Sequence, residues 1–254
     1  MEITDAAAVV SGGASGLGEA AARMLAGAGV SVTILDRDTA RGEEVASSIG
    51  GRFVVCDVTD EAQVGAAVDA AAGGAAPLRI AVNCAGIGPA ARVVGRDGRP
   101  HPLDVYERVI AVNQVGTFNV LRIAAAAMAR TDPLADGERG VIVNTASIAA
   151  YEGQVGQIAY SASKGAIVAM TLAAARDLAS VGVRVCTIAP GTFETPLLAT
   201  LPEATREVLA KQVVFPVRLG RPSDFAHLLR AIVENSYLNG ETIRLDGALR
   251  MPPR

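Results

Sequence analysis

The chain has 254 residues, of which 50% are hydrophobic and 19% are charged, and its formal net charge is −3. This composition predicts a soluble globular protein and excludes a general attraction to nucleic acid or to an anionic membrane surface. The N-terminus has no secretory signal pattern, and we expect no apolar run long enough to span a bilayer. Neither nucleic acid nor a membrane is therefore an expected partner.

The three cysteines, Cys56, Cys84 and Cys186, each end or interrupt a strand-like apolar run. Their odd number favours reduced, buried thiols in a cytoplasmic protein over disulfides. The sequence contains two histidines, and no cluster of cysteine and histidine accompanies them. We therefore expect no metal site and no histidine-dependent catalytic triad.

Short apolar runs rich in β-branched residues alternate with longer helical patterns along the chain. The predicted strands are Ala6–Val10, Ser31–Asp36, Arg52–Cys56, Ile80–Asn83, Gly140–Thr145, Val183–Ala189 and Glu241–Leu245. The predicted helices are Leu17–Ala28, Thr39–Ile49, Glu61–Ala72, Leu103–Ala129, Ile158–Ser180 and Pro222–Glu234. This alternation predicts an α/β protein with a Rossmann-type, doubly wound parallel sheet of about seven strands and helices on both faces.

Three irregular segments interrupt this alternation. Gly95–Pro102 and Thr131–Arg139 are polar and rich in turn residues, so we expect exposed loops there. The longest, residues 190–217, contains four prolines and follows the sixth predicted strand. Ligands of open α/β sheets bind beyond the carboxyl ends of the strands, so this segment is a candidate lid. No linker divides the pattern, and residues 1–254 are expected to form a single domain.

The first predicted strand leads into a glycine-rich turn, Ser11–Gly18, and then directly into a helix. Glycines permit a tight turn and close approach of the backbone to a pyrophosphate, whose charge the helix N-terminus favours. Asp36 ends the second predicted strand, eighteen residues after Gly18, where a carboxylate would bind ribose hydroxyls. The pattern predicts dinucleotide binding. Asp36 would repel a 2′-phosphate and so favours NAD over NADP, although Arg37 could accommodate that phosphate.

Two further strand ends are compatible with the same cofactor. Asp57 and Val58 follow the third predicted strand, where the carboxylate could meet an adenine amino group. Asn83–Gly86 follows the fourth, and its small residues would let the backbone approach a ribose. An ordinary strand-to-loop turn explains either segment taken alone. Their position at successive strand ends is what favours a binding role.

A phenol, an ammonium and a hydroxyl are predicted to meet near the end of the fifth strand. Tyr160 and Lys164 are four residues apart in a helical pattern and share a face. Ser147 lies thirteen residues before Tyr160, where the strand gives way to a loop. Lys164 is one of only two lysines in the chain, which argues against a chance pairing. This set predicts proton transfer to or from an alcohol or carbonyl, with Tyr160 as the base.

Tyr160 would need a lowered pKa to act as a base near neutral pH. Lowering the pKa by about two to three units requires roughly 3–4 kcal/mol. An ammonium about 4 Å away supplies roughly 4 kcal/mol at an effective dielectric constant of 20. We therefore expect Lys164 to lower the pKa of Tyr160, and Ser147 to hold the reacting oxygen.

Together these motifs resemble the short-chain dehydrogenase/reductase family over nearly the whole chain. The matching segments are the turn from Ser11 to Gly18, the turn from Asn83 to Gly86, Asn113, Ser147, the Tyr160–Lys164 pair and Pro190–Gly191. Ser11 stands where the family usually has threonine, and Cys84 where it has asparagine. Stretches such as NTASIAA, EGQVGQ and YSASKG resemble, within that family, the type II 3-hydroxyacyl-CoA dehydrogenases, which also include 17β-hydroxysteroid dehydrogenases.

The resemblance implies a reversible, NAD-dependent oxidation of an (S)-3-hydroxyacyl-CoA to a 3-oxoacyl-CoA by a homotetramer. It implies catalytic roles for Ser147, Tyr160, Lys164 and Asn113, the last by widening its helix, and substrate contacts from Ser147, Gln154 and Gln157. The implied NAD contacts are Gly12, Ser15, Gly16, Leu17, Gly18, Asp36, Asp57, Val58, Cys84, Ala85, Gly86, Tyr160, Lys164, Pro190, Phe193 and Thr195. Glu194 stands where glycine is expected, so it bears on acyl preference.

Two other functions are compatible with the same residues. One is a short-chain dehydrogenase acting on a secondary alcohol, a hydroxysteroid or a 3-oxoacyl group on a carrier protein. The other is a non-catalytic NAD-binding sensor. Asp36 argues against the carrier-protein reductases, which usually use NADPH, and the complete set of Ser147, Tyr160 and Lys164 argues against a sensor.

Overall fold

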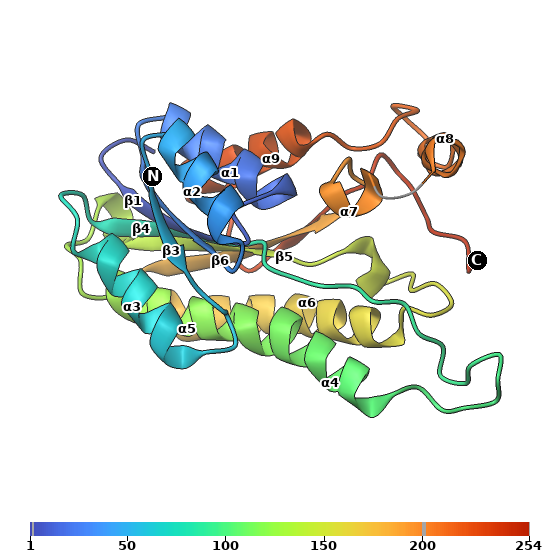
Figure 1. The fold of residues 1–254 in the computed structure, drawn as a ribbon. Coiled ribbons are helices and arrows are strands. Elements are labelled where there is room, and N and C mark those ends of the chain that lie inside the picture. Colours follow the sequence, from blue (N-terminus) through green and yellow to red (C-terminus); the bar gives the residue numbers. More distant parts are fainter. Residues whose placement is uncertain (2, 200–201, 254) are drawn as a thin grey trace.

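The computed structural model describes residues 1, 3–199 and 202–253 and is built on a seven-stranded parallel sheet (Figure 1). The strands are β1 (Ala7–Ser11), β2 (Ser31–Asp36), β3 (Arg52–Val55), β4 (Leu78–Asn83), β5 (Gly140–Thr145), β6 (Val183–Pro190) and β7 (Thr242–Leu245). Their order across the sheet is β3-β2-β1-β4-β5-β6-β7. Strand order therefore reverses between β1 and β4, and a crevice for a ligand forms where these two strands end.

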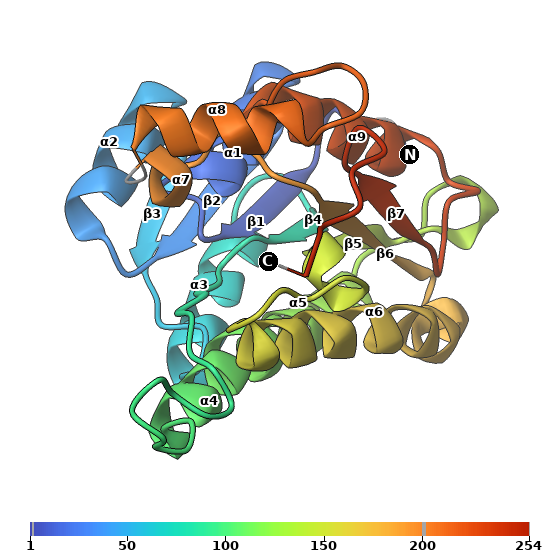
Figure 2. The same ribbon diagram turned by 90° about the vertical axis from the view of Figure 1, so that its right-hand side faces the viewer.

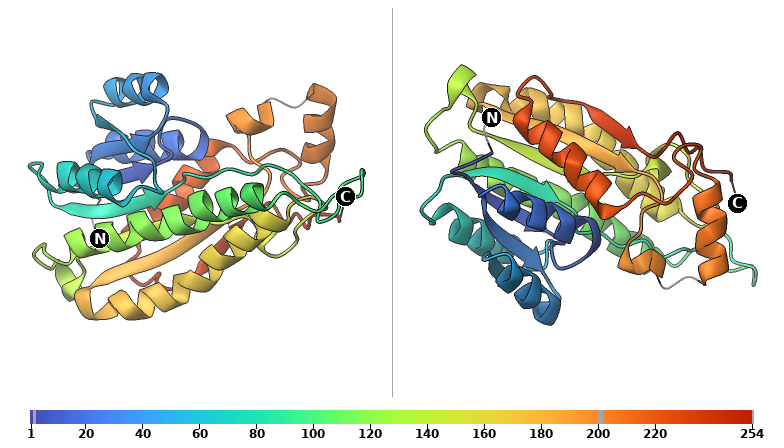
Figure 3. Two further views of the ribbon diagram at one scale, coloured as in Figure 1. Left: turned by 60° about the horizontal axis from the view of Figure 1, so that its bottom comes forward. Right: turned by 90° about the horizontal axis from the view of Figure 1, so that it is seen from above.

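Helices cover both faces of the sheet (Figures 1 and 3). One layer contains α1 (Gly16–Gly27), α2 (Thr39–Ser48) and α9 (Pro222–Glu234), and the other contains α3 (Glu61–Ala72), α4 (Leu103–Ile110), α5 (Gly116–Met128) and α6 (Ile158–Leu178). This arrangement confirms the predicted doubly wound α/β fold. Two short helices, α7 (Pro196–Ala199) and α8 (Glu203–Lys211), lie beside the C-terminal segment at one end of the sheet (Figure 2).

The strand sequences explain why both faces are covered. Every residue of β1, β4, β5 and β6 is buried. Successive side chains of a strand point to opposite faces, so Val10 and Ile34 pack in the core beneath α1 and α9. Val9 and Leu35 pack in the core beneath α3 and α5. The edge strands β3 and β7 are only partly covered, as their more polar sequences predict.

The predicted elements match the structure closely, with two differences. Residues 190–217, predicted to be irregular, contain α7 and α8. The single helix predicted over Leu103–Ala129 is divided, because a π-helical segment, Ala111–Val115, separates α4 from α5. A π-helical segment in the middle of a helix often marks a functional position.

Two helical stretches, Leu103–Met128 and Ile158–Val181, are long and apolar enough to cross a membrane, judged by length and composition alone. The expectation that no run reaches this length is therefore wrong. Half of the apolar window of the first stretch and a third of the second are buried inside the protein. Val120 and Met128 of α5 are buried in the core that also contains Val9 and Leu35 of the sheet. This packing gives the first stretch a structural reason for its apolar character.

Glu138 lies in the segment predicted as an exposed loop, yet the structure buries it. Its carboxylate accepts a hydrogen bond from Arg184 Nε of β6 at 2.8 Å, and both side chains are less than a tenth exposed. The Arg184 guanidinium also donates to the carbonyls of Ile232 and Val233 at the end of α9. The pair therefore ties the loop before β5 to β6 and α9.

Replacing Arg184 by methionine is expected to lower the free energy of unfolding by about 3–5 kcal/mol, because the buried Glu138 carboxylate would keep only Ser236 and the N-terminal ammonium, 3.5 Å away, as partners. Urea denaturation measures this loss. The matched control is Arg230→Met, which breaks an exposed pair with Glu234 and is expected to cost under about 1 kcal/mol. Equal losses in the two variants would contradict the role given to the buried pair.

Candidate active site

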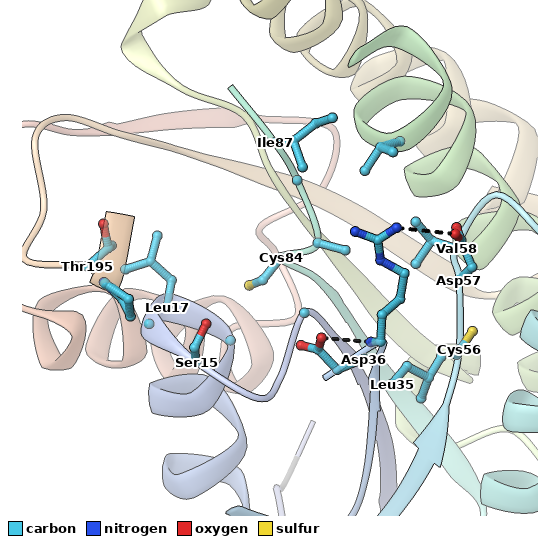
Figure 4. A pocket seen from close by; sticks show the side chains of 18 residues that line it. Ser15, Leu17, Leu35, Asp36, Cys56, Asp57, Val58, Cys84, Ile87 and Thr195 are labelled. Carbon is cyan, nitrogen blue, oxygen red and sulfur yellow. Dashed lines mark hydrogen bonds and ion pairs between the residues drawn. The ribbon is translucent and has the colours of Figure 1, made fainter. Parts of the chain in front are cut away.

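A cavity of about 330 Å³ lies where the turn after β1 meets the ends of β2, β3 and β4 (Figure 4). It is lined by many of the residues predicted to bind a cofactor: Gly12, Ser15, Gly16, Leu17, Gly18, Asp36, Asp57, Val58, Cys84, Ala85, Gly86 and Thr195. They come from four strand ends and from the segment after β6. Parallel strands with their carboxyl ends at one edge bring these distant positions together.

The glycine-rich turn has a backbone conformation that suits the binding of an anion. Gly12 and Gly16 have φ angles of +68° and +54°, in the left-handed region that favours glycine. A Cβ on Gly18 would collide with the carbonyl of Gly12, so the turn cannot close around a larger residue. Ser15 is the N-cap of α1, and its side chain makes no capping hydrogen bond. The free N–H groups of the first helical turn and this hydroxyl fit a pyrophosphate.

The carboxylate of Asp36 joins the turn to the end of β2. It accepts backbone hydrogen bonds from Ala14 at 3.1 Å, Arg37 at 2.7 Å and Asp38 at 3.1 Å. The guanidinium of Arg37 extends to Asp57, with 3.6 Å between Nη1 and the carboxylate (Figure 4). Asp57 holds a lowered pKa mainly because the Thr59 backbone N–H donates to it, and Arg37 contributes in the same direction. Two carboxylates and one arginine thus share this end of the cavity.

Ser147, Tyr160 and Lys164 come together beside the other end of the cavity. Ser147 follows β5 and is the N-cap of a short 3₁₀ turn, where its Oγ accepts a hydrogen bond from the Ala149 N–H at 3.1 Å. Tyr160 lies in the first turn of α6 and Lys164 one turn later. The Lys164 Nζ lies 5.7 Å from the centre of the Tyr160 ring and donates to the carbonyl of Thr145 at 2.7 Å.

The loop after β4 connects these groups to the cavity. A Cβ built on Gly86 would lie 3.6 Å from the Lys164 Nζ, and one on Gly88 would lie 3.3 Å from the Tyr160 ring. Gly86 itself lines the cavity. A molecule that fills the cavity along this loop therefore reaches the phenol and the ammonium.

Burial dominates the ionisation of both groups in the protein without cofactor. It raises the pKa of the Tyr160 phenol above its usual value, while a hydrogen bond with Ser147 acts in the opposite direction. Burial also lowers the pKa of Lys164 to about 8. This differs from the expected lowering of the Tyr160 pKa by Lys164. The ammonium points to the Thr145 carbonyl, so the phenol gains less from its charge than the spacing suggests.

Cys84 contacts Thr145, the residue at the end of β5 that also accepts the hydrogen bond from Lys164. Its Sγ lies 3.4 Å from the Thr145 hydroxyl, and burial raises the pKa of the thiol to about 11. The thiol therefore stays protonated at neutral pH and acts as a small packing group with a weak hydrogen bond. This agrees with the free, reduced state expected for it.

Asn113 explains the break between α4 and α5. Its side-chain amide accepts from the Ile87 N–H and donates to the Ile87 carbonyl, both at 2.8 Å, and it also donates to Ser163 Oγ at 3.0 Å. These contacts draw the widened helical turn toward the loop after β4 and toward α6. Asn113 is therefore a fully buried connection between the cavity wall and the helix that carries Tyr160 and Lys164.

Of the predicted residues at the end of β6 and in the segment after it, some line the cavity and others do not. Pro190 is buried at the end of β6, and Thr195 lines the cavity. The ring of Phe193 packs against Gly220 and does not line the cavity. Glu194 is exposed and lines a neighbouring cavity of about 730 Å³ between α1 and α7. Contact of Phe193 and Pro190 with a cofactor stays a prediction.

Gln154 and Gln157, predicted to contact substrate, both make hydrogen bonds within the protein. The Gln154 amide donates to the Pro252 carbonyl at 3.0 Å, and the Gln157 amide oxygen accepts from the Gln154 backbone N–H at 3.0 Å. Their contact with substrate stays a prediction.

Arg37, considered above only as a possible partner of a 2′-phosphate, lines the cavity as well, and five further lining residues were not predicted: Leu35, Cys56, Ile87, Val112 and Pro196. Leu35 and Cys56 directly precede Asp36 and Asp57, so apolar residues beside the strand-end carboxylates could have indicated them. Val112 depends on the π-helical turn, and Pro196 depends on how the segment after β6 folds back. Neither has a local sequence signal.

Comparisons with known proteins show the family to which this chain belongs. Residues 6–206 match the short chain dehydrogenase family. The chain is 53% identical over 254 residues to the 3-hydroxyacyl-CoA dehydrogenase type-2 of Drosophila melanogaster, covering 99% of this chain and 100% of that protein. It is 54% identical over 249 residues to the human protein of the same name, covering 97% and 95%.

A solved structure has the same fold. The 3-hydroxyacyl-CoA dehydrogenase type-2 from Mycobacterium avium superposes with a TM-score of 0.95 and 45% sequence identity, covering 98% of both chains. The family match spans most of the chain and includes the glycine-rich turn, Ser147, Tyr160 and Lys164. The chain therefore belongs to the short-chain dehydrogenase family and is an oxidoreductase that uses a nicotinamide cofactor.

Proposed function

We propose that this enzyme catalyses the reversible oxidation of (S)-3-hydroxyacyl-CoA to 3-oxoacyl-CoA with NAD. The single observation that carries the proposal is the convergence of Ser147, Tyr160 and Lys164 beside the cavity that the glycine-rich turn and Asp36 line. The substrate class is supported by relatives over 50% identical along the whole chain, which are named 3-hydroxyacyl-CoA dehydrogenases. The (S) configuration follows the resemblance noted in the sequence.

Each group in the set has a distinct task. The nicotinamide, when bound, supplies the hydride acceptor or donor. Ser147 holds the substrate oxygen by a hydrogen bond and stabilises charge that develops there. Tyr160 takes the proton of the substrate hydroxyl during oxidation and returns it during reduction. Lys164, with a pKa of about 8, is mostly protonated at neutral pH, so its ammonium favours the phenolate form of Tyr160.

Asn113 keeps this set in register. Its amide fixes Ile87 on the loop that passes the phenol and Ser163 on the helix that carries it. We assign it a positioning role, in which the π-helical turn holds α6 against the cofactor cavity. The wider turn also leaves room for a proton path from Lys164 to solvent.

The charges around Asp36 support NAD over NADP. The carboxylates of Asp36 and Asp57 both line the cavity, and the one arginine beside them, Arg37, is already paired with Asp57. A 2′-phosphate would have to displace that pair and would face the Asp36 carboxylate.

The proposal also includes the domain organisation, the oligomeric state and the cellular location of the protein. Residues 1–254 act as one dinucleotide-binding domain, and residues 190–217 act as a lid over the substrate. Phe118 of α5 and Leu172 of α6 are each about half exposed, which suits contact between copies in a homotetramer. The three cysteines are free, which suits the cytoplasm.

Replacing Tyr160 by phenylalanine is expected to reduce kcat for acetoacetyl-CoA reduction by about 10²–10⁴-fold, because the proton donor is removed. NADH binding, measured by fluorescence titration, should stay within a factor of about two, since the cavity lining is unchanged. Tyr237→Phe, at a fully exposed position, is the matched control and should behave as wild type. Turnover close to wild type in Tyr160→Phe would refute the assignment.

NADH is expected to support acetoacetyl-CoA reduction with at least a tenfold higher kcat/KM than NADPH, roughly the effect of one strongly disfavoured charge contact. Asp36→Ala should narrow this ratio by weakening NADH binding and easing the repulsion of the 2′-phosphate. Asp69→Ala, which removes an exposed carboxylate outside the cavity, should leave the ratio unchanged. A wild-type preference for NADPH would overturn the cofactor assignment.

Tyr160 is expected to ionise at a lower pH when NAD⁺ is bound. In the free protein burial raises the pKa of the phenol above 10, so it stays protonated at neutral pH. A bound positive charge beside it favours the phenolate and lowers that pKa. The phenolate absorbance difference between wild type and Tyr160→Phe, titrated with and without NAD⁺, measures the shift. Equal midpoints in the two titrations would contradict it.

A further inference from the structure

The loop between the catalytic serine and tyrosine, residues 151–157, is held by the C-terminal tail, residues 250–253. The Met251 N–H donates to the Glu152 carboxylate at 3.1 Å, and the Gln154 amide donates to the Pro252 carbonyl at 3.0 Å. The Val155 N–H donates to the Pro253 carbonyl at 3.1 Å. Three successive tail residues therefore form hydrogen bonds with three residues of one loop. The tail and the loop run side by side in a fixed register, which a single chance contact would not produce.

An ionic cluster fixes the start of the tail. Arg244 of β7 makes a two-pronged contact with Glu152, at 2.8 and 3.1 Å, and also bonds Asp246 and the Leu249 carbonyl. Arg250 reaches Glu152 at 3.3 Å. Hydrogen bonds from Arg244 hold the pKa of Glu152 below its usual value, so the cluster is charged at neutral pH. Pro252 and Pro253 have fixed φ angles, which makes the tail stiff beyond this anchor.

The opposite side of the loop is held independently. The Ala91 N–H donates to the Gly156 carbonyl at 2.9 Å, and Ala91 pairs with Gln157 as an isolated parallel bridge. The Gln157 carbonyl then accepts from the Ser161 N–H at 2.7 Å, in the first turns of α6 that carry Tyr160. The loop therefore lies between the tail and the segment after β4, and its far end leads directly into the catalytic helix.

This loop forms one wall of a separate cavity of about 420 Å³. Gln154 and Val155 line it together with Val93, Val94 and Ile158, whose side chains are largely exposed and apolar. Ser161 also lines it, and the buried hydroxyl of this residue has no hydrogen-bond partner among the described residues. Apolar walls with one such hydroxyl fit an alkyl or amide-containing chain. The two residues that the tail holds are therefore wall residues of a cavity that also includes Ile158 and Ser161, the neighbours of Tyr160 in the first turns of α6.

We propose that the C-terminal tail is a positioning element that holds residues 151–157 as a wall for the acyl-pantetheine part of the substrate. Glu152 is the positioning residue through which Arg244 and the tail act. The tail contributes to substrate binding and not to the chemical step, because Ser147 is fixed by its own 3₁₀ turn and Lys164 by Thr145. This inference rests on the proposed acyl-CoA activity for its choice of substrate.

The test compares the full chain with a chain that ends at Leu249 and with Glu152→Gln. In the shortened chain KM for acetoacetyl-CoA is expected to rise about fivefold or more, with kcat within about twofold, the signature of lost ground-state binding. Glu152→Gln should move KM in the same direction by a smaller factor. Glu234→Gln, on the exposed end of α9, is the matched control and should leave both constants unchanged. Unchanged KM in the shortened chain, or a loss confined to kcat, would overturn the proposal.

A second measurement needs no substrate. Amide hydrogen exchange in residues 151–157 is expected to become at least about tenfold faster in the shortened chain, because the Val155 N–H loses its acceptor, while exchange in β5 stays unchanged. NADH affinity should also be unchanged. If exchange in the loop is unaffected, the positioning role is wrong whatever the substrate. If exchange accelerates but the full chain does not reduce acetoacetyl-CoA, the proposed substrate is wrong and the tail contact stands.

Discussion

A polar ladder across the ends of three neighbouring strands is the constraint on which the site depends. Parallel pairing places Ser11 of β1 opposite Asn83 of β4, and Asn83 opposite Asn144 of β5. The Ser11 hydroxyl donates to the Asn83 amide oxygen at 3.2 Å, and the Asn83 amide donates to Asn144 at 2.9 Å. These buried bonds fix the strands' relative register, since a slip of one residue would leave the polar groups unpaired.

Three parts of the site follow this ladder within a few residues. The glycine-rich turn begins directly after Ser11, the loop with Gly86 begins after Asn83, and Ser147 lies three residues beyond Asn144. The carbonyl of Thr145, next to the ladder, accepts the hydrogen bond from the Lys164 ammonium. One set of strand ends therefore positions the glycine-rich turn, the Ser147 hydroxyl and the Lys164 ammonium at the same time. This shared origin explains how groups over 150 residues apart in the chain stay in mutual register.

Burial has opposite effects on the two catalytic ionisable groups. It raises the pKa of Tyr160 and lowers that of Lys164, because in both groups desolvation acts against the charged form. The protein without cofactor is thus not yet set for proton abstraction. A bound cofactor with positive charge at the same place would shift this balance. In the proposed mechanism, cofactor binding and proton transfer would therefore be coupled through electrostatics.

Much of this protein could be derived from its sequence. Continuous apolar β-branched runs separated by helices determined the doubly wound sheet, because buried parallel strands require covering on both faces. The spacing of Tyr160 and Lys164, the glycine-rich turn and the position of Asp36 at a strand end were also visible, since helical periodicity and turn chemistry are local properties.

What only the tertiary structure decided are contacts between segments far apart in the sequence. The pairing of Arg37 with Asp57, the bonds of Asn113 to Ile87 and Ser163, and the burial of Glu138 against Arg184 have no local signal. The rise in the pKa of Tyr160 also has no local signal, because desolvation depends on what packs around the phenol. The attachment of the C-terminal tail to residues 151–157 is likewise a contact that only the tertiary structure decides. Local sequence sets each element and its turn, whereas the distances and the burial that tune the site arise only when the sheet brings those elements to one edge.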